Sequence, residues 1–195
     1  MRIFLGVFPP REIVDDFRSF KQQLKKQKQN LRFIPAPDIH LTVKFLGTNV
    51  SQASAGFVKD VIGNTLKTQT PFDVTIRDVR FGLPQDTKSR LLIAEIEESE
   101  ELENLVERID AELARKNLKD VYPRRRRFIP HITLARIHSN YHSKKIREIN
   151  DAIDQAIFES AGRTFTVNMI KMINAEPVKD GQVYRVLKEY KLSEE

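Results

Sequence analysis

The feature that most constrains this chain is a phrase that occurs twice. Residues 31–47 read LRFIPAPDIHLTVKFLG, and residues 127–136 read RFIPHITLAR. Both contain Arg-Phe-Ile-Pro, followed by a histidine, an apolar residue and a threonine. The two histidines, His40 and His131, stand 91 positions apart (131 minus 40), close to half of the 195 residues. The repeat is too long for a solenoid, so it predicts two α+β lobes related by a pseudo-two-fold axis.

The hydrophobic periodicity of the two halves supports this duplication. Each half reads as a strand, a helix, a histidine-bearing strand, a helix and a strand. The expected strands are 3–8, 39–46, 72–77, 91–96, 132–136, 165–173 and 184–190, and the expected helices are 11–29, 51–67, 99–117 and 143–161. We therefore expect a single domain spanning residues 1–195, with duplicated halves at roughly 1–82 and 90–190.

Strand geometry groups the polar residues of each copy on one face. Side chains at positions i and i+2 of a strand point the same way, so His40 projects with Thr42 and His131 with Thr133. If the symmetry axis brings these faces together, two imidazoles and two hydroxyls converge on one cleft. The apolar face of the first copy is expected to carry Ile39, Leu41, Val43 and Phe45, with Lys44 on the polar face.

Two imidazoles and two hydroxyls suit the hydrolysis of a phosphodiester. Imidazole titrates near neutrality, so one ring can accept a proton from a nucleophile while the other gives one to a leaving group. Threonine hydroxyls can hold the anionic oxygens of a phosphate. A single histidine on a strand is usually structural, but two in equivalent places of a repeat favour catalysis, and this chemistry needs no metal or cofactor in principle.

Composition narrows the alternatives. The chain has no cysteine, which excludes thiol catalysis, disulfides and zinc–cysteine sites. No apolar run reaches the length of a membrane span, and the start MRIFLGVFPPREIVDDF is not a secretory signal. We expect a soluble, cytoplasmic protein with no membrane partner. The net charge of +6 points weakly to anionic partners.

Another pair of histidines raises the question of a metal site. His138 and His142 are spaced as i and i+4, a spacing that can ligate zinc on a helix. Their segment, HSNYHS, reads as a surface loop and has no accompanying carboxylate motif. We therefore expect no metal here.

The segments HLTVKFLG and FIPHITLAR resemble the paired signatures of the two-histidine (2H) phosphoesterase superfamily. The resemblance is best with its RNA 2′,3′-cyclic phosphodiesterases, historically called 2′-5′ RNA ligases, and extends to the opening RIFLGVFPP and the tail GQVYRVLKEYKL. It implies an α+β, bilobal LigT-like fold with two antiparallel-rich sheets, outer helices and a central groove. It also implies hydrolysis of RNA 2′,3′-cyclic phosphate ends to 2′-phosphomonoesters without a cofactor.

The resemblance also implies roles for single residues. His40 would be the proton donor and His131 the proton acceptor, while Thr42 and Thr133 would hold the phosphate oxygens. Arg136 matches the arginine of the HITLAR pattern and becomes a candidate phosphate ligand. Because Thr133 and Arg136 have opposite strand parity, Arg136 reaches the groove only through a bulge or at the strand end.

Two further positions have two interpretations each, and a third departs from the pattern of the family. Arg127 ends the run Arg124–Arg127, which either follows an RNA backbone or forms a solvated face. Phe33 stands where relatives often carry tryptophan, and it either stacks on a base or belongs to the core. Ala175 stands where relatives often have serine, so a supporting hydroxyl is absent here.

The expected partner is RNA with a 2′,3′-cyclic phosphate end, or a cyclic nucleotide, bound by a monomer. Two alternatives stay open. A 2′-5′ RNA ligase, or a phosphodiesterase of 2′-5′ linkages, would use the same acid–base pair with an RNA hydroxyl in place of water. A nucleotide- or RNA-binding module would bind RNA in a salt-sensitive way without turnover.

Overall fold

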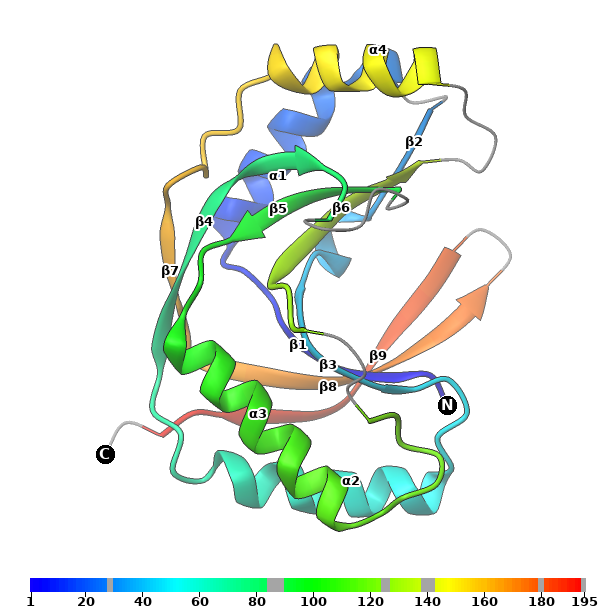
Figure 1. Ribbon diagram of the computed structural model, residues 1–195, viewed down its shortest axis with the longest axis vertical. Coiled ribbons are helices and arrows are strands. Elements are labelled where there is room, and N and C mark those ends of the chain that lie inside the picture. Colours follow the sequence, from blue (N-terminus) through cyan, green and yellow to red (C-terminus); the bar gives the residue numbers. More distant parts are fainter. Residues whose placement is uncertain (28–29, 84–89, 124–126, 138–142, 179–180, 194–195) are drawn as a thin grey trace.

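The computed structural model describes residues 1–27, 30–83, 90–123, 127–137, 143–178 and 181–193 (Figure 1). The strands are β1 (Ile3–Val7), β2 (Leu31–Phe33), β3 (Leu41–Gly47), β4 (Phe72–Phe81), β5 (Leu91–Ile96), β6 (His131–Ile137), β7 (Thr164–Val167), β8 (Met169–Val178) and β9 (Gly181–Lys191). The helices are α1 (Arg11–Gln23), α2 (Gln52–Leu66), α3 (Glu100–Arg115) and α4 (Ser143–Asp154), with short 3₁₀ turns at Lys25–Gln27 and Ala36–Asp38. The predicted α+β class is confirmed.

The strands form one curled antiparallel sheet in the order β7-β4-β5-β6-β3-β1-β8-β9. Its two halves meet where β3 pairs with β6 through the single residue pair Leu41 and Ile132. Beyond this pair the two strands diverge, and β2 pairs with the remaining edge of β6. The two antiparallel sheets expected from the sequence are therefore continuous at one point, which we call the seam.

Each end of the curled sheet forms a lobe with its own helices (Figure 1). The upper lobe contains β2, β4 to β7, α1 and α4, and the lower lobe contains β1, β3, β8, β9, α2 and α3. Helix α1 follows β1 of the lower lobe but packs on the upper lobe. Helix α3 follows β5 of the upper lobe but packs on the lower lobe. Each lobe is thus completed by a helix that begins from a strand of the other.

Hydrogen bonds from buried and capping side chains fix these helices. Asp16 of α1 is 8% exposed and accepts the backbone N–H groups of Glu159 and Ser160, at 3.3 and 2.6 Å. Ser51 caps α2 and Ser99 caps α3, because their hydroxyls accept N–H groups at the start of each helix. Both caps agree with the predicted helix starts.

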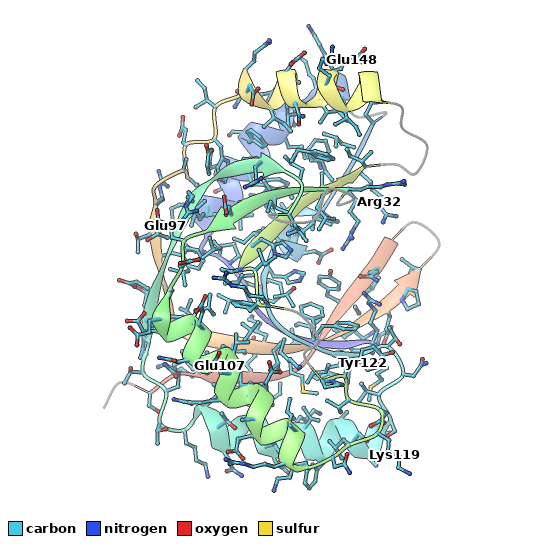
Figure 2. All side chains as sticks on the ribbon, viewed as in Figure 1. Arg32, Glu97, Glu107, Lys119, Tyr122 and Glu148 are labelled. Atoms are coloured by element: carbon cyan, nitrogen blue, oxygen red, sulfur yellow. The ribbon has the colours of Figure 1, made fainter. Side chains whose placement is uncertain are left out.

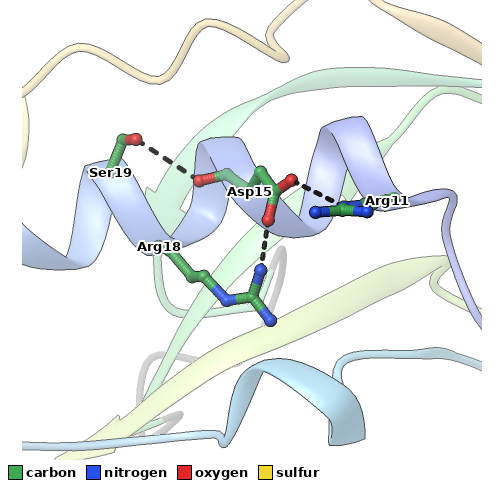
Figure 3. Close-up of polar contacts among 4 residues, drawn as sticks. All are labelled: Arg11, Asp15, Arg18 and Ser19. Atoms are coloured by element: carbon green, nitrogen blue, oxygen red, sulfur yellow. Dashed lines mark hydrogen bonds and ion pairs between the residues drawn. The ribbon is translucent and has the colours of Figure 1, made fainter.

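The opposite face of α1 is solvated. Figure 3 shows Asp15 between Arg11 and Arg18, both of which pair with its carboxylate, while the Ser19 hydroxyl donates to the Asp15 backbone oxygen at 3.3 Å. Charged residues on this face and apolar residues on the other give the helix its amphipathic pattern. The buried residues of this helix are Ile13, Asp16, Phe17 and Phe20.

Both histidine-bearing strands contain a β-bulge at the same position of the motif. In β3, the neighbouring strand pairs Leu5 with Lys44 and Gly6 with Thr42, which leaves Val43 unpaired. A bulge of this kind reverses the alternation of the residues that follow it. The predicted faces of residues 44 and 45 are therefore wrong: Lys44 is buried, with its ammonium 2.5 Å from Asp110 of α3, and Phe45 lies on the face of Thr42.

Other departures from the predicted elements concern where a strand is divided and where two helices end. Residues 165–173 form two strands, because β7 pairs with β4 in the upper lobe and β8 pairs with β1 in the lower lobe. Helix α1 ends at Gln23 and α4 ends at Asp154, earlier than the apolar periodicity indicated. No helix among the described residues is long and apolar enough to cross a bilayer.

Candidate active site

The seam brings the two predicted motifs together. Leu41 and Ile132 are directly opposite in an antiparallel pair, and each is flanked by a histidine and a threonine. Alternation therefore places His40, Thr42, His131 and Thr133 on the face opposite to the buried Leu41 and Ile132. In this register His40 lies across from Thr133, and Thr42 lies across from His131. We call this surface the site face.

Both imidazoles are held by the same backbone contact. His40 donates from Nδ1 to the carbonyl oxygen of Asp38 at 2.6 Å, and His131 donates from Nδ1 to the carbonyl oxygen of Ile129 at 2.8 Å. A carbonyl only accepts, so Nδ1 carries the proton in each neutral ring. This leaves Nε2 of each ring available to accept or deliver a proton.

Burial and neighbouring charge act on both rings in the same direction. Burial lowers the pKa of His40 and of His131, because it disfavours the charged form. The Arg136 charge lowers both pKa values further, and His131 also lowers the pKa of His40. The two imidazoles therefore lie within electrostatic reach of each other.

Aromatic rings surround His40 on the site face. Its imidazole stacks on Phe4 with 4.5 Å between ring centroids and an interplanar angle of 24°. Phe8 and Tyr184 lie at 5.6 and 5.5 Å from the same ring. Ala175 is buried beneath, cross-strand from Tyr184, in a small apolar cluster separate from the main core. The methyl group at this position thus packs among aromatic side chains.

Gly6 makes the close approach of His40 to β1 possible. A Cβ atom at this position would lie 3.0 Å from Phe4 and 3.4 Å from the His40 ring. Glycine within a strand often marks such an approach. The stretch IFLGVF, apolar on both of its faces around this glycine, was the available signal that one face covers something other than the core.

His131 has a different neighbour. The residue cross-strand from it on β5 is Glu95, whose carboxylate lies 3.7 Å from Arg77 and 3.9 Å from Arg80. In the other lobe the corresponding neighbour is Phe8, which follows the paired residue Val7 on β1 and lies beside His40. The two motifs are alike in backbone, but one histidine has aromatic neighbours and the other a carboxylate held by arginines.

The second bulge turns Arg136 toward the histidines. On β6, Thr133 pairs with Ile93 and Ala135 pairs with Leu92, so Leu134 is the extra residue. Leu134 and Ala135 are both buried, and Arg136 points to the site face with Thr133. The sequence indicated that Arg136 could reach the groove only through a bulge or at the strand end, and this bulge is present.

Two predicted substrate contacts lie elsewhere. Phe33 is cross-strand from Ala135 on the core side of β2, packs against the main core and has the Lys21 ammonium 5.4 Å from its ring centre. Arg127 pairs with Glu98 at 3.2 Å, beyond the end of β5. Neither residue is among the groups of the site face: Phe33 agrees with its core interpretation, and contact of either residue with RNA stays a prediction. The expectations for Arg124–Arg126, His138 and His142 fall outside the described residues.

The described residues contain no group of three histidine, aspartate or glutamate side chains placed to hold a metal ion. The chemical groups of the site face include two imidazoles, two threonine hydroxyls, the Tyr184 hydroxyl and the Arg136 guanidinium. Burial raises the pKa of Tyr184, so its hydroxyl stays protonated and able to donate. This set can transfer protons and bind an anion.

Sequence comparisons identify known proteins that this chain resembles. The AKAP7 2′5′ RNA ligase-like domain model matches residues 4–192. An RNA 2′,3′-cyclic phosphodiesterase of Methanothermobacter thermautotrophicus is 21% identical over 192 residues, covering 98% of this chain and 99% of the relative. One of the same name from Methanocaldococcus jannaschii is 24% identical over 193 residues, covering 97% of this chain and 100% of the relative.

Solved structures share the fold. A crystal structure from Thermus thermophilus aligns with a TM-score of 0.80 at 22% identity and covers 98% of both chains. Escherichia coli LigT complexed with 3′-AMP aligns with a TM-score of 0.75 at 20% identity, covering 99% of this chain and 98% of LigT. Because the family model spans nearly the whole sequence, the chain belongs to the AKAP7 2′5′ RNA ligase-like domain family.

Proposed function

We propose that the protein hydrolyses 2′,3′-cyclic phosphate ends of RNA to 2′-phosphomonoesters, using His40 and His131 without a metal. The observation that carries this proposal is the pairing of the two motifs at the seam, with both Nδ1 atoms bound to carbonyl oxygens. Two Nε2 atoms on one face can then serve one phosphorus atom. The names of the curated relatives agree with this substrate.

The other groups of the site face would bind the phosphate. The hydroxyls of Thr42 and Thr133 donate to its non-bridging oxygens, and the Arg136 guanidinium offsets its negative charge. Each threonine lies cross-strand from the histidine of the other motif. One phosphate bound between the two strands therefore meets a hydroxyl and an imidazole from each.

In the reaction, His131 Nε2 accepts a proton from water, and the resulting hydroxide attacks phosphorus. The bond from phosphorus to the 3′ oxygen breaks, and His40 Nε2 donates a proton to that oxygen. The product carries a 2′-phosphate and a free 3′ hydroxyl. This division of roles follows the resemblance of the segments HLTVKFLG and FIPHITLAR to the paired signatures of the superfamily.

The first test is hydrolysis of a nucleoside 2′,3′-cyclic phosphate in excess EDTA, followed by phosphorus NMR. The wild type should give only the 2′-phosphomonoester. His40→Ala and His131→Ala should each lower kcat/KM by at least about a hundredfold, the scale of a lost general acid or base. Circular dichroism would confirm that both variants are folded.

A second substrate tests how the roles are divided. A 3′-deoxynucleoside 2′-(4-nitrophenyl phosphate) has a leaving group that departs without a proton, and it has no 3′ hydroxyl that could attack phosphorus in place of water. His40→Ala should regain most of its lost rate on it, whereas His131→Ala should not, so each variant controls for the other. Full activity of either variant on the cyclic substrate would refute the mechanism, and joined RNA from cyclic-phosphate and 5′-hydroxyl halves would favour the ligase alternative.

A further inference from the structure

A second arginine stands beside Arg136 on the site face. In the short pairing of β2 with β6, Arg32 is directly opposite Arg136, while the neighbouring pair of Phe33 with Ala135 faces the core. Side chains of a directly opposite pair start about 5 Å apart at Cβ. Arg32 is exposed, and Figure 2 shows it on the upper lobe, on the side where the β8–β9 hairpin projects.

This pair of like charges lacks an acidic partner in the described chain. No described carboxylate forms an ion pair with Arg32 or Arg136. Arg2, from the lower lobe, places its guanidinium 4.8 Å from the centre of the Phe45 ring on the same face. Burial lowers the pKa of Arg136, and the charges of Arg32 and Arg2 lower it further. The charges of Arg32 and Arg2 therefore repel that of Arg136, and a bound anion would offset this repulsion.

Directly opposed like charges destabilise a pair of strands. The strands could avoid this cost with any neutral residue at position 32, since Arg32 makes no hydrogen bond within the described structure. An anion bound by both Arg32 and Arg136 would account for an arginine at position 32. The forked donors of arginine suit the oxygens of a phosphate.

We propose that Arg32, together with Arg136, binds the phosphodiester immediately 5′ to the cyclic phosphate of an RNA end. This inference rests on the proposed function and adds a substrate preference to it. A cyclic mononucleotide has no second phosphate, so it leaves Arg32 without a ligand. An RNA end of two or more nucleotides supplies that anion next to the one held by the threonines.

The two copies of the repeated phrase differ in length, and this difference explains why only the arginine of the first copy has this role. Arg32 and Arg127 begin the same Arg-Phe-Ile-Pro phrase, but four residues separate Pro35 from His40 in the first copy and none separates the corresponding residues in the second. The added length, which includes the turn Ala36–Asp38, allows β2 to reach the free edge of β6. Arg127 instead pairs with Glu98.

The test compares three substrates: a cyclic mononucleotide, a dinucleotide with a 2′,3′-cyclic end, and the same dinucleotide with an uncharged methylphosphonate at the internal linkage. The wild type should hydrolyse the charged dinucleotide about tenfold better in kcat/KM than the methylphosphonate, as expected for a charge-assisted contact. In Arg32→Ala this ratio should fall to about threefold or less, because only Arg136 still meets the linkage, while rates on the methylphosphonate and the mononucleotide change by less than about twofold.

Arg147→Ala is the matched control. Arg147 is exposed on α4, on the outside of the upper lobe, and its loss removes the same net charge (Figure 1). It should keep the tenfold ratio. A wild-type ratio near one, or an unchanged ratio in Arg32→Ala, would overturn the second phosphate site. Equilibrium binding of the dinucleotide 2′-phosphate and of its methylphosphonate analogue gives the same comparison without turnover. If the protein does not hydrolyse the cyclic substrates, the proposed function fails, but the binding ratio still tests the second phosphate site.

Discussion

At the scale of single residues, Arg136 connects substrate binding to proton transfer. Its charge lowers the pKa of both histidines, in addition to the effect of burial. A histidine with a lowered pKa stays neutral to lower pH, so a catalytic base in this site keeps working below the ordinary value near 6.5. The acidic limb of the pH–rate profile should therefore lie below that of an unperturbed imidazole.

Replacing Arg136 by glutamine should move this limb. With the charge removed, both histidine pKa values rise, and the acidic limb of kcat/KM shifts to higher pH. The position of the limb is the measurement, because the plateau also falls through weaker phosphate binding. Arg136→Lys keeps the charge and should leave the limb near its wild-type position. A limb that stays fixed in Arg136→Gln would show that Arg136 does not act on the pair.

The residues of the site differ in how far sequence could predict them. His40, Thr42, His131 and Thr133 follow from the repeat, because two copies of one strand pattern select the same positions. Arg32 does not, because its phrase also occurs at Arg127, and only the pairing partner of each copy separates them. The rings around His40 come from β1 and β9, and no spacing in the sequence relates those strands to residue 40.

At the scale of elements, the paired bulges determine what each strand presents. The positions that correspond across the seam are Phe45 and Arg136, since each follows its bulge on the site face. Tyr122 lies beside Phe45, as Arg32 lies beside Arg136, and Figure 2 shows Tyr122 and Arg32 on different lobes. The lower lobe thus presents aromatic rings where the upper lobe presents guanidinium groups.

Periodicity predicted these strands but not their bulges. A two-residue alternation assigned Phe45 to the core and left Arg136 out of phase, because one extra unpaired residue is invisible in a hydrophobic pattern. The bulges become visible only in the pairing with the neighbouring strands, where the register shifts between β1 and β3 and between β5 and β6. The helix starts were predictable because the capping residues Ser51 and Ser99 act locally.

The close packing of β1 against His40 predicts a sensitive glycine. In Gly6→Ala the new methyl group should displace the imidazole by a few tenths of an ångström, since Phe4 and His40 leave it too little room. We expect kcat to fall about tenfold, because small displacements of catalytic groups are costly. Steady-state kinetics on a cyclic mononucleotide would measure it.

Gly56→Ala is the matched substitution for Gly6→Ala. A methyl group there would meet no atom within 4 Å on helix α2, so activity should be unchanged. Stability should rise by about 0.5–1 kcal/mol, because alanine is the better helix residue. Wild-type kcat in Gly6→Ala would mean that the His40 position tolerates the shift.

At the scale of the whole molecule, the exchanged helices tie the halves together. Asp16 of α1 binds two backbone N–H groups near residue 160, more than 140 positions away. Asp16→Ala should lower the free energy of unfolding by about 1–3 kcal/mol, because the buried N–H of Ser160 and the partly buried N–H of Glu159 lose their partner. Urea denaturation would measure this loss, and activity per folded molecule should be unchanged.

Asp15→Ala provides the comparison for Asp16→Ala. Its carboxylate belongs to the same helix but makes exposed ion pairs with Arg11 and Arg18, which are worth less than about 1 kcal/mol (Figure 3). Equal losses in the two variants would contradict the view that α1 anchors the second half of the chain. The exchange also bears on the expected duplication, since we propose that neither half, 1–82 or 90–190, folds alone.

The seam has a mechanical consequence. Because Leu41 and Ile132 form the only residue pair between β3 and β6 within the described chain, a tilt of the lobes about this point would cost little backbone bonding between these two strands. The separation of the two Nε2 atoms then follows the tilt. Substitutions in the outer helices, far from either imidazole, can therefore change the distance between the two Nε2 atoms. A different distance would suit either a cyclic phosphodiester or a longer linear one.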